Sequence, residues 1–292
     1  MIGLIGGTGL GEALMGENRG QEHDIETPFG KPSGPVRVVE WNGIELAMIS
    51  RHGDGHTLNP SVVPYRANIY ALKTLGVTHV IASGAVGSLR NHIRPRDLVV
   101  VDQVIDKTHR RASSFFDANL AVHIEFAEPY CAQLRGLLNS LSSGIDAKLH
   151  ERGTYVCMEG PAFSTRAESN MHREWGADLI GMTTLPEAKL AREAEMCYVA
   201  IALVTDYDCW RSSETEKSRQ ALLNEIIDNL KDATLHGIAL MRAAIDAIAE
   251  KPLEPCRCQT ALDLAVWSNR DKLTEPLRQH YGPLLARYLS KS

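Results

Sequence analysis

The sequence predicts an α/β fold in which buried strands alternate with helices along the chain. Apolar runs at residues 77–82 and 197–205 have the length of buried strands, and segments with helical spacing of apolar residues lie between such runs. A chain of 292 residues that is 44% hydrophobic can bury a large core. Chains of this class and length often form one domain. We therefore expect one main domain at residues 1–250. A C-terminal extension is expected at residues 251–292, with the Cys256-Arg257-Cys258 pair and an added helical tail from Trp267 on.

The first half of the chain is expected to begin with a strand and a hairpin. Residues 1–10 form a buried strand that runs into a glycine turn, and residues 35–50 form an antiparallel hairpin around Asn42-Gly43. The elements expected next are a helix with Tyr65, Ile69 and Leu72 at helical spacing, a strand at 77–82 that ends in a small-residue turn at 83–87, and a strand at 97–105.

The second half is expected to contain two helices with side-chain caps. Thr165 and Glu168 form a capping box for a helix to about residue 175, and Thr184 with Glu187 form another. Pro186 lies in the first turn of the second helix, where proline is tolerated. The remaining expected elements are a helix near 129–142, strands at 178–182 and 197–205, a mostly helical segment at 215–250 and, after Pro252 and Pro255, a short helical stretch before 267.

Composition and charge exclude several classes of protein. The formal net charge is −5 and no dense stripe of Lys and Arg occurs, which argues against nucleic acid as the main partner. No run of 18 apolar residues is present, and the N-terminus lacks the basic segment and the cleavage site of a signal peptide. We therefore expect a soluble, cytoplasmic protein with no membrane partner.

The six cysteines are expected to be reduced thiols rather than metal ligands. Four of them lie in apolar or strand-like contexts: Cys131, Cys157, Cys197 and Cys209. Cys256 and Cys258 differ from these four because only one residue separates them in the sequence. One such pair is too isolated for a four-ligand zinc site unless subunits share it. Two ordinary thiols are therefore expected there, with a redox or structural role as the alternative, and no metal ion is expected.

The glycine-rich segment "GLIGGTGLGEAL" at the first strand invites a dinucleotide-binding interpretation. That motif needs a helix next and then a parallel strand, whereas further glycines interrupt the segment and the next strand belongs to the hairpin. A nicotinamide enzyme is therefore disfavoured. The loop Gly6-Gly7-Thr8-Gly9 can still hold one phosphate through main-chain N–H groups and the Thr8 hydroxyl, or form only a tight turn.

Several candidate anion ligands follow predicted strands. Arg51-His52 comes directly after an apolar run. The planar guanidinium group of arginine matches the geometry of phosphate oxygens. Taken alone, Arg51-His52 is explained equally well by ion pairs on the surface. Similar positions are expected for Thr8, the Gly84-Ala85 turn and Thr183. Ligands of open α/β sheets bind at the carboxyl ends of strands. Together these residues predict an anion site at that edge of the sheet.

Asp206 and Asp208 follow the apolar strand at 197–205. Alternate residues of a strand face the same side, so the two carboxylates are expected to project together where the chain leaves the sheet. Metal binding is weakly supported because no histidine or acidic partner lies at ligand spacing, and helix capping would use only one of the two. The remaining interpretation is that the two carboxylates bind a polar ligand. A carboxyl group in such a site can also donate or accept a proton.

Five segments together make the chain resemble the purine nucleoside phosphorylases, and most closely the methylthioadenosine phosphorylase branch: "GLIGGTGL", "RHGDGH", "NPSVVPYRANIYALK", "MEGPAFSTRAES" and "GADLIGMTTLPEAKLAREAEMCYVAIALVTDYDCW". The resemblance covers about residues 1–250. It implies a single α/β domain with a mixed, partly barrel-like sheet flanked by helices, assembled as a homotrimer. The implied reaction is phosphorolysis, in which inorganic phosphate attacks the sugar C1′ as the bond to the purine breaks. Phosphate is the co-substrate, and no other cofactor is implied.

The resemblance also implies roles for individual residues. It assigns phosphate binding to Thr8, Arg51, His52, Gly84, Ala85 and Thr183. It matches Met182 to a residue that packs on the ribose, Phe163 to one that stacks on the purine, and Asp206 and Asp208 to carboxylates at the purine edge. His123 matches a histidine that reaches the sugar 5′ end in a neighbouring subunit. Asp206 is the implied catalytic residue, because a carboxyl group there can supply a proton to N7 of the leaving purine.

Some positions depart from the pattern of that branch. Gly84 stands where threonine is frequent, which removes one hydroxyl from the phosphate site, and Gly181 replaces the usual asparagine. Lys217 and Arg219 fall where small apolar residues would line the methylthio pocket, and a charge there would disfavour an apolar 5′ group. The alternative is a local shift of the match, since Leu222-Leu223 still agrees with the family.

The expected function is phosphate-dependent cleavage of 5′-methylthioadenosine to adenine and 5-methylthioribose 1-phosphate, a step of purine and methionine salvage. Phosphorolysis of adenosine or of 6-oxopurine nucleosides is the alternative within the enzymes. From another class, the alternative is a catalytically silent nucleoside-binding relative, against which the candidate ligands at nearly every phosphate position argue. Because Asp206 rather than asparagine stands at the base-reading position, a preference for 6-aminopurines is expected.

Overall fold

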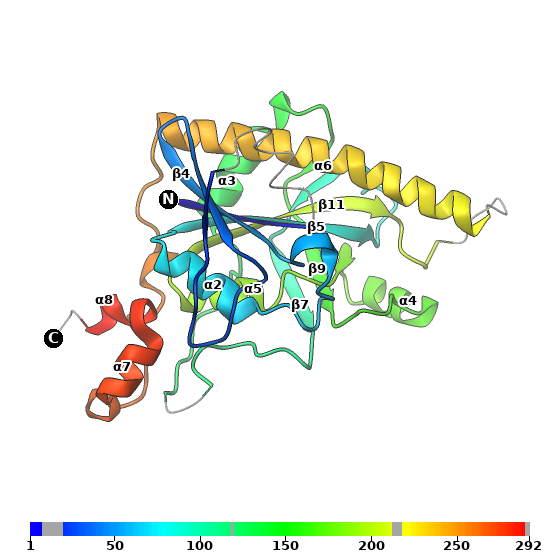
Figure 1. Cartoon of the computed structure of the whole chain (residues 1–292). Coiled ribbons are helices and arrows are strands. Elements are labelled where there is room, and N and C mark those ends of the chain that lie inside the picture. Colours follow the sequence, from blue (N-terminus) through cyan, green and yellow to red (C-terminus); the bar gives the residue numbers. More distant parts are fainter. Residues whose placement is uncertain (8–19, 118–119, 212–217, 290–292) are drawn as a thin grey trace.

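The computed structural model describes residues 1–7, 20–117, 120–211 and 218–289. Within these residues, eleven strands form one mixed sheet with helices packed on both faces (Figure 1). The predicted α/β fold with a mixed sheet is confirmed. The strand order is β2-β3-β4-β1-β5-β10-β9-β7, and β5 is a branch point because it also pairs with β11. Strand β11 in turn pairs with β6, and β6 pairs with β8.

The strands, labelled as in Figure 1, are β1 (Ile2–Gly6), β2 (Gln21–His23), β3 (Val36–Trp41), β4 (Ile44–Ser50), β5 (His79–Ser88), β6 (Leu98–Val100), β7 (Gln103–Lys107), β8 (Leu149–His150), β9 (Thr154–Met158), β10 (Leu179–Gly181) and β11 (Cys197–Asp206). The α-helices are α2 (Tyr65–Thr74), α3 (Ala132–Ser140), α4 (Arg166–Glu174), α5 (Glu187–Glu193), α6 (Arg219–Glu250), α7 (Glu275–Tyr281) and α8 (Ala286–Leu289). Short 3₁₀ turns lie at Asp54–His56, Ser142–Gly144, Arg257–Thr260, Arg270–Lys272 and Gly282–Leu284.

The predicted hairpin is confirmed and joins β3 to β4. Asn42 has φ 48° and Gly43 has φ 79°, and a two-residue hairpin turn of type I′ requires positive φ at both central positions. The strands pair antiparallel from Trp41↔Ile44 onward. Strand β4 then pairs parallel with β1, so the hairpin places the end of β4 beside the end of β1.

The small-residue turn predicted at residues 83–87 was wrong. Strand β5 continues through this segment to Ser88 and pairs with β11 as far as Asp206. Small residues serve here to admit close neighbours, since a Cβ on Gly84 would lie 3.0 Å from Thr183 Oγ1. The single strand predicted at 97–105 is likewise two strands, because β6 pairs antiparallel with β11 whereas β7 pairs parallel with β9.

Two hydrophobic clusters cover the two faces of the central strands. Helices α3 and α6 pack on β11 on one face, and α2 packs against α5 on the other, where α5 also contacts β11 (Figure 1). The long helix α6 accounts for the helical segment predicted at 215–250, of which residues 218–250 are described. Among the described residues, no helix is long and apolar enough to cross a membrane.

The C-terminal extension packs onto the main domain. Leu262, Tyr281 and Leu285 are buried and belong to the same hydrophobic cluster as strand and helix residues of the main domain. The extension is also tied to the segment around residue 122 by a bridge between Val122 and Val266. The boundary at residue 250 therefore separates stretches of sequence that share one core.

Candidate active site

Arg51 lies directly after β4 and is buried, with 2% of its surface exposed. Its Nε and Nη2 donate to the two carboxylate oxygens of Glu187, each at 2.8 Å, and Nη1 donates to the main-chain oxygen of Ser83 at 2.9 Å. A guanidinium has five N–H donors. Two of them, one on each Nη, form no hydrogen bond with a described residue and are available to an anion.

Glu187 keeps Arg51 charged and fixes its orientation. Burial alone lowers the pKa of Arg51, but the adjacent Glu187 carboxylate outweighs it and raises that pKa above its ordinary value. Glu187 is itself fully buried and also accepts a hydrogen bond of 2.7 Å from the Tyr198 hydroxyl. The two parallel hydrogen bonds to Glu187 hold the guanidinium plane of Arg51 in a fixed orientation. Its two remaining N–H groups therefore point in a fixed direction.

The capping box predicted for Thr184 and Glu187 was therefore wrong. Helix α5 begins at Glu187 without a side-chain cap, and the Thr184 hydroxyl lies 2.8 Å from that of Tyr130. The other predicted box is confirmed: the Thr165 hydroxyl accepts from the Glu168 N–H, and the Thr165 N–H donates to the Glu168 carboxylate. The same Thr-x-x-Glu pattern thus caps a helix at Thr165 and Glu168, whereas at Thr184 and Glu187 the glutamate pairs with Arg51 instead.

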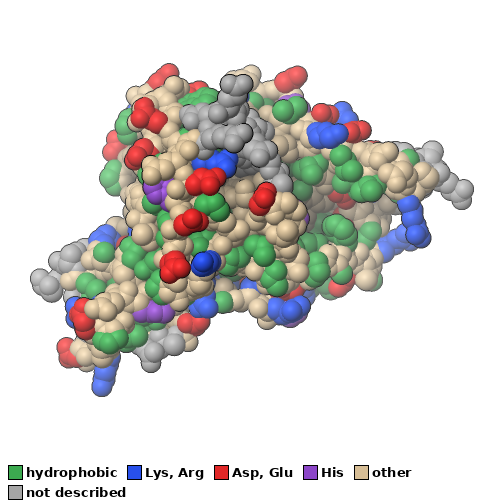
Figure 2. Space-filling view, viewed as in Figure 1, with side chains coloured by type: hydrophobic (Ala, Val, Ile, Leu, Met, Phe, Trp, Pro, Cys, Tyr) green, Lys and Arg blue, Asp and Glu red, His purple; other side chains and the backbone are tan. Residues whose placement is uncertain are grey.

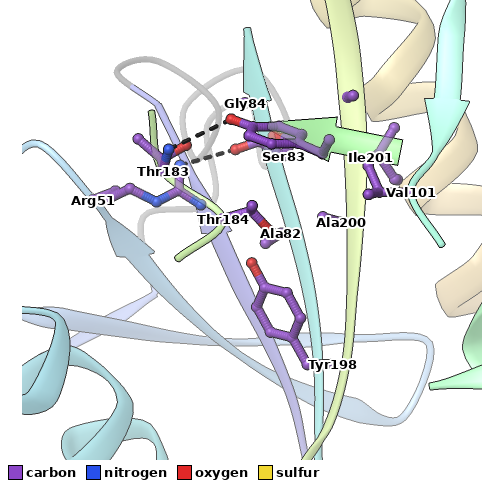
Figure 3. A pocket seen from close by; sticks show the side chains of 12 residues that line it. Arg51, Ala82, Ser83, Gly84, Val101, Thr183, Thr184, Tyr198, Ala200 and Ile201 are labelled. Carbon is purple, nitrogen blue, oxygen red and sulfur yellow. Dashed lines mark hydrogen bonds between the residues drawn. The ribbon is translucent and has the colours of Figure 1, made fainter. Parts of the chain in front are cut away.

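A small pocket brings together part of the predicted phosphate set (Figure 3). Its lining residues are Arg51, Ala82, Ser83, Gly84, Val101, Tyr155, Thr183, Thr184, Tyr198, Ala200, Ile201 and Ala202. Arg51, Gly84 and Thr183 were predicted phosphate ligands, and Gly84 lies against the Thr183 hydroxyl. Ala85 follows on β5. Thr8 lies outside the described residues.

His52 lies beside Arg51 with one ring nitrogen already used. Its Nδ1 is 2.8 Å from the main-chain oxygen of Leu58, and since a carbonyl only accepts, Nδ1 carries the proton. Burial lowers the pKa of His52, and the charge of Arg51 lowers it further, although the Leu58 hydrogen bond opposes both. The neutral ring therefore presents the Nε2 lone pair, and it stacks on His56 with ring centroids 4.2 Å apart.

Asp206 ends β11 in a setting that favours its protonated form. Burial raises the pKa of Asp206 above its ordinary value, hydrogen bonds from Thr205 and from the N–H of Asp208 lower it, and the Asp208 carboxylate raises it. Thr205 Oγ1 donates to Asp206 Oδ1 at 2.6 Å and also lies 3.2 Å from the Val86 oxygen.

The prediction that Asp206 and Asp208 alternate along one strand was wrong. Strand β11 ends at Asp206, and Asp208 lies in the following turn with φ 49°. The N–H of Asp208 folds back to donate to Asp206 Oδ2 at 2.8 Å. Asp208 Oδ2 is buried and has no hydrogen-bond partner among the described residues, so it is available to a ligand.

Strand β5 connects the two groups of candidate residues. Gly84 contacts Thr183, and three residues further a Cβ on Gly87 would lie 3.2 Å from the Cβ of Asp208. Three residues of strand span about 10 Å. The pocket that contains Arg51 and the pair of carboxylates therefore lie about one nucleoside length apart along the same strand.

Met182 and Phe163 lie on loops near these groups. A Cβ on Gly160, which has φ 68°, would lie 2.6 Å from the Met182 sulfur, so the loop that carries Phe163 packs on Met182. The Cys209 thiol donates to the main-chain oxygen of Ser164 at 3.3 Å, which joins this loop to the turn of Asp208. Phe163 is 84% exposed in the single chain.

His123 lies elsewhere in the single chain. Its ring packs edge-on against Trp267 of the C-terminal extension, with centroids 4.9 Å apart, and its N–H donates to the Ala265 oxygen. The structure therefore does not bring His123 together with Arg51 or Asp206 within one chain.

The departure from the family pattern at Gly181 has a structural explanation. A Cβ on Gly181 would lie 1.9 Å from the Tyr155 hydroxyl, so asparagine cannot fit while Tyr155 occupies this place. The Tyr155 oxygen accepts instead from the N–H of Thr183 at 3.4 Å. Arg219 begins α6 and is exposed, and Lys217 lies outside the described residues.

Sequence reasoning missed Arg111, which fastens the site loops together. Its side chain is 1% exposed and donates to the main-chain oxygens of Met182, Leu185 and Glu159, at 2.6, 2.5 and 2.6 Å. These carbonyl groups belong to residues 48 to 74 positions away in the sequence. No local sequence pattern therefore indicates the role of Arg111. Glu187 was missed as a site residue because its sequence pattern fits a helix cap.

The prediction that Cys256 and Cys258 are too isolated for a four-ligand site was also wrong. The structure places their sulfur atoms with those of Cys131 and Cys197, and all four lie within 4.8 Å of one another. The cluster arises from the start of α3, the start of β11 and the segment after α6, which meet only in the folded chain.

Comparison with known proteins places these features in a family. Residues 1–246 match the Phosphorylase superfamily, and the chain belongs to it. The matched range includes Arg51, Glu187 and Asp206.

The similar enzymes point to one branch of that superfamily. The S-methyl-5′-thioadenosine phosphorylase of Synechocystis sp. is 43% identical over 290 residues, covering 98% of this chain and 87% of its own length. That of Geobacter sulfurreducens is also 43% identical and covers 99% of both chains. The resemblance to the methylthioadenosine phosphorylase branch is confirmed.

Solved structures agree with this placement. A methylthioadenosine phosphorylase from an antarctic soil metagenomic library has a TM-score of 0.89 and 41% identity, covering 97% of this chain and 98% of its own. The Schistosoma mansoni methylthioadenosine phosphorylase in complex with adenine has a TM-score of 0.82 and 31% identity, covering 91% and 98%.

Proposed function

We propose that the protein cleaves 5′-methylthioadenosine with inorganic phosphate, giving adenine and 5-methylthioribose 1-phosphate. The observation that carries this proposal is the 43% identity to an S-methyl-5′-thioadenosine phosphorylase over 99% of both chains. The site supports it, because the pocket at Arg51 and the Asp206 carboxyl group, whose pKa burial raises, lie about one nucleoside length apart.

The phosphate is bound at the pocket of Figure 3. Arg51 offers two N–H groups in a fixed direction, and Thr183 offers a hydroxyl beside the main chain of Gly84. Thr8, Ala85 and His52 complete the proposed set. Because His52 is neutral with its proton on Nδ1, its Nε2 accepts a hydrogen bond from a phosphate hydroxyl.

The purine is bound at the carboxylate pair. Asp206 donates its proton to N7 as a phosphate oxygen attacks C1′; the bond from C1′ to N9 breaks and its electrons pass to the purine ring. The electron-poor sugar is stabilised by the phosphate dianion on one face. Asp208 accepts from the purine edge, Phe163 stacks on the ring and Met182 packs on the ribose. Solvent returns the proton to Asp206 after adenine leaves.

The active form is a homotrimer in which His123 reaches the sugar of a neighbouring subunit. Large hydrophobic side chains along the first half of α6 are exposed in the single chain: Leu222, Leu223, Ile226, Ile227 and Leu230. Figure 2 shows hydrophobic side chains gathered on this side of the molecule, beneath the N-terminal half of α6. Monomers seldom expose so many apolar side chains together, so burial against another copy explains them. Phe163, which is also exposed, is covered in the same way or by the purine.

The remaining parts of the proposal follow from the same reaction. Inorganic phosphate is the co-substrate and the chemistry needs no other cofactor, since the attacking group, the proton and the leaving purine are all accounted for. The reaction belongs to purine and methionine salvage, and a salvage enzyme of this kind works in the cytoplasm.

One assay tests the proposal against its alternatives. Purified protein is incubated with methylthioadenosine, adenosine, inosine and methylthioinosine, each with and without phosphate, and the free base is measured. Phosphate-dependent release of adenine, with the highest kcat/KM for methylthioadenosine, is expected. A higher kcat/KM for adenosine or inosine would support the alternative phosphorylases, and no cleavage of any substrate would support the silent relative.

A further inference from the structure

The four-cysteine cluster lies at the opposite end of β11 from Asp206. Cys197 begins this strand and Asp206 ends it. Nine residue steps along a strand correspond to about 30 Å. The cluster is therefore remote from the phosphorolysis site, and the chemistry proposed above does not use it.

The sulfur atoms are spaced like the ligands of one metal ion. Cys256 Sγ lies 3.2 Å from Cys197 Sγ and 3.7 Å from Cys131 Sγ, and no pair of the four sulfurs exceeds 4.8 Å. In a tetrahedral site with Zn–S bonds of 2.3 Å, the sulfur atoms are about 3.8 Å apart. Disulfide sulfurs are about 2.05 Å apart, so the observed spacing fits a shared ion better than two covalent pairs.

The surroundings suit thiolates. Cys131 occupies the N-cap of α3, where the positive end of the helix dipole favours a negative sulfur. The N–H of Cys258 donates to Cys256 Sγ at 3.3 Å, the kind of contact that compensates sulfur charge. Cys131, Cys197 and Cys258 are buried and Cys256 is half-buried, so solvent has little access to the group.

A buried cation lies close to the same group. Arg192 is 8% exposed and donates only to the main-chain oxygens of Glu125, Glu128 and Pro129, and no carboxylate of the described residues pairs with it. Arg192 precedes Cys197 by five residues in the chain. A site of four thiolates and one divalent ion carries a net charge of −2, which Arg192 partly offsets.

We propose that Cys131, Cys197, Cys256 and Cys258 bind one zinc ion as a closed, tetrahedral structural site. Four protein ligands leave no open position, which distinguishes a structural from a catalytic zinc ion. Binding converts four thiols to thiolates and releases their four protons to solvent. The ion fastens the segment after α6 to the starts of α3 and β11, and so anchors the C-terminal extension that packs on the main domain.

Metal analysis of the purified full-length protein tests this proposal. The protein is expressed in zinc-supplemented medium and purified at neutral pH, without chelators and under nitrogen. Elemental analysis should find one zinc per chain, and X-ray absorption at the zinc edge should show four sulfur neighbours at about 2.3 Å. Iron in place of zinc, a mixed oxygen and nitrogen shell, or no stoichiometric metal would overturn the assignment.

Variants and thiol counting separate the ion from disulfides. Cys256→Ser/Cys258→Ser should lose the zinc, whereas Cys209→Ser, which changes a cysteine outside the cluster, should keep one per chain. After denaturation with a chelator and no reductant, alkylation should label all six cysteines of the unmodified protein. Four unlabelled cysteines that become reactive only after reduction would show two disulfides and overturn the proposal. If the double variant does not fold, the absorption spectrum and thiol count of the unmodified protein still decide.

Discussion

Glu187 holds Arg51 through two parallel hydrogen bonds of 2.8 Å, and both side chains are almost wholly excluded from solvent. The pair joins the end of β4 to the start of α5 across 136 residues of sequence. It therefore links the position of Arg51, the proposed phosphate ligand, to the folding of the sheet.

Replacing Glu187 by glutamine should destabilise the protein strongly. The change leaves Arg51 charged, buried and without its anionic partner, and breaking such a pair costs about 3–5 kcal/mol. Glu22→Gln is the matched control, since Glu22 accepts from Arg37 at the same 2.8 Å but both side chains are substantially exposed. That control should cost at most about 1 kcal/mol. Chemical denaturation measures both, and equal losses would contradict the role given to Glu187.

Much of this site could be predicted from sequence because its parts follow strands. Arg51, Thr183 and Asp206 were placed at strand ends from apolar runs, and strand ends of a parallel sheet meet at one edge. The Asn42-Gly43 hairpin was equally accessible, since its turn chemistry is local.

The parts that escaped prediction depend on tertiary contacts. Glu187 fits a capping pattern as well as Glu168 does, and only the distant Arg51 decides between the two uses. The residues at 83–87 read as a turn because they are small, although their size serves to admit Thr183 and Asp208 beside a continuous strand. The convergence of Cys131 with Cys256 had no local signal at all.

Asp206→Asn should change the choice of base. Asparagine cannot protonate N7, so kcat/KM for adenine nucleosides should fall; losing one hydrogen bond to a buried group costs about 1–3 kcal/mol, or one to two powers of ten. Its amide can rotate to donate to O6 and N7 of a 6-oxopurine, so the rate on inosine relative to adenosine should rise. Steady-state kinetics with both nucleosides measure this. An unchanged ratio would mean that Asp206 does not read the base.

Glu193 should make the protein less stable as the pH rises from about 4.5 to about 7. Burial raises the pKa of Glu193 from 4.5 to about 7, although hydrogen bonds from Phe115 and Ser114 oppose it. The folded state then binds more protons than the unfolded state between these values, so stability falls with pH there, by about 3 kcal/mol.

Glu193→Gln removes this titration, so its free energy of unfolding should depend less on pH across the same range. Glu125→Gln, at an exposed position, serves as the control and should follow the unmodified protein. Urea denaturation at a series of pH values measures the three proteins. Parallel curves for all of them would exclude Glu193 as the source.

Leu223→Glu/Ile227→Glu should dissociate the proposed trimer. Both side chains are exposed on α6 in the single chain, and burying a carboxylate in an apolar interface is strongly unfavourable. Sedimentation should shift from three chains of 32.1 kDa to one, with loss of activity if the sites are shared as proposed. Leu235→Glu, at a more exposed position on another face of the same helix, should stay trimeric. Full activity in a monomeric double variant would contradict shared sites.

The fate of phosphate during the reaction tests the central claim most directly. Methylthioadenosine and inorganic phosphate are incubated with the purified protein, adenine is quantified by chromatography, and phosphorus is followed by ³¹P NMR. Phosphorolysis predicts that one sugar 1-phosphate ester appears, and one inorganic phosphate disappears, for each adenine released. Adenine release with the phosphate signal unchanged would mean that water attacks C1′ and would contradict the account.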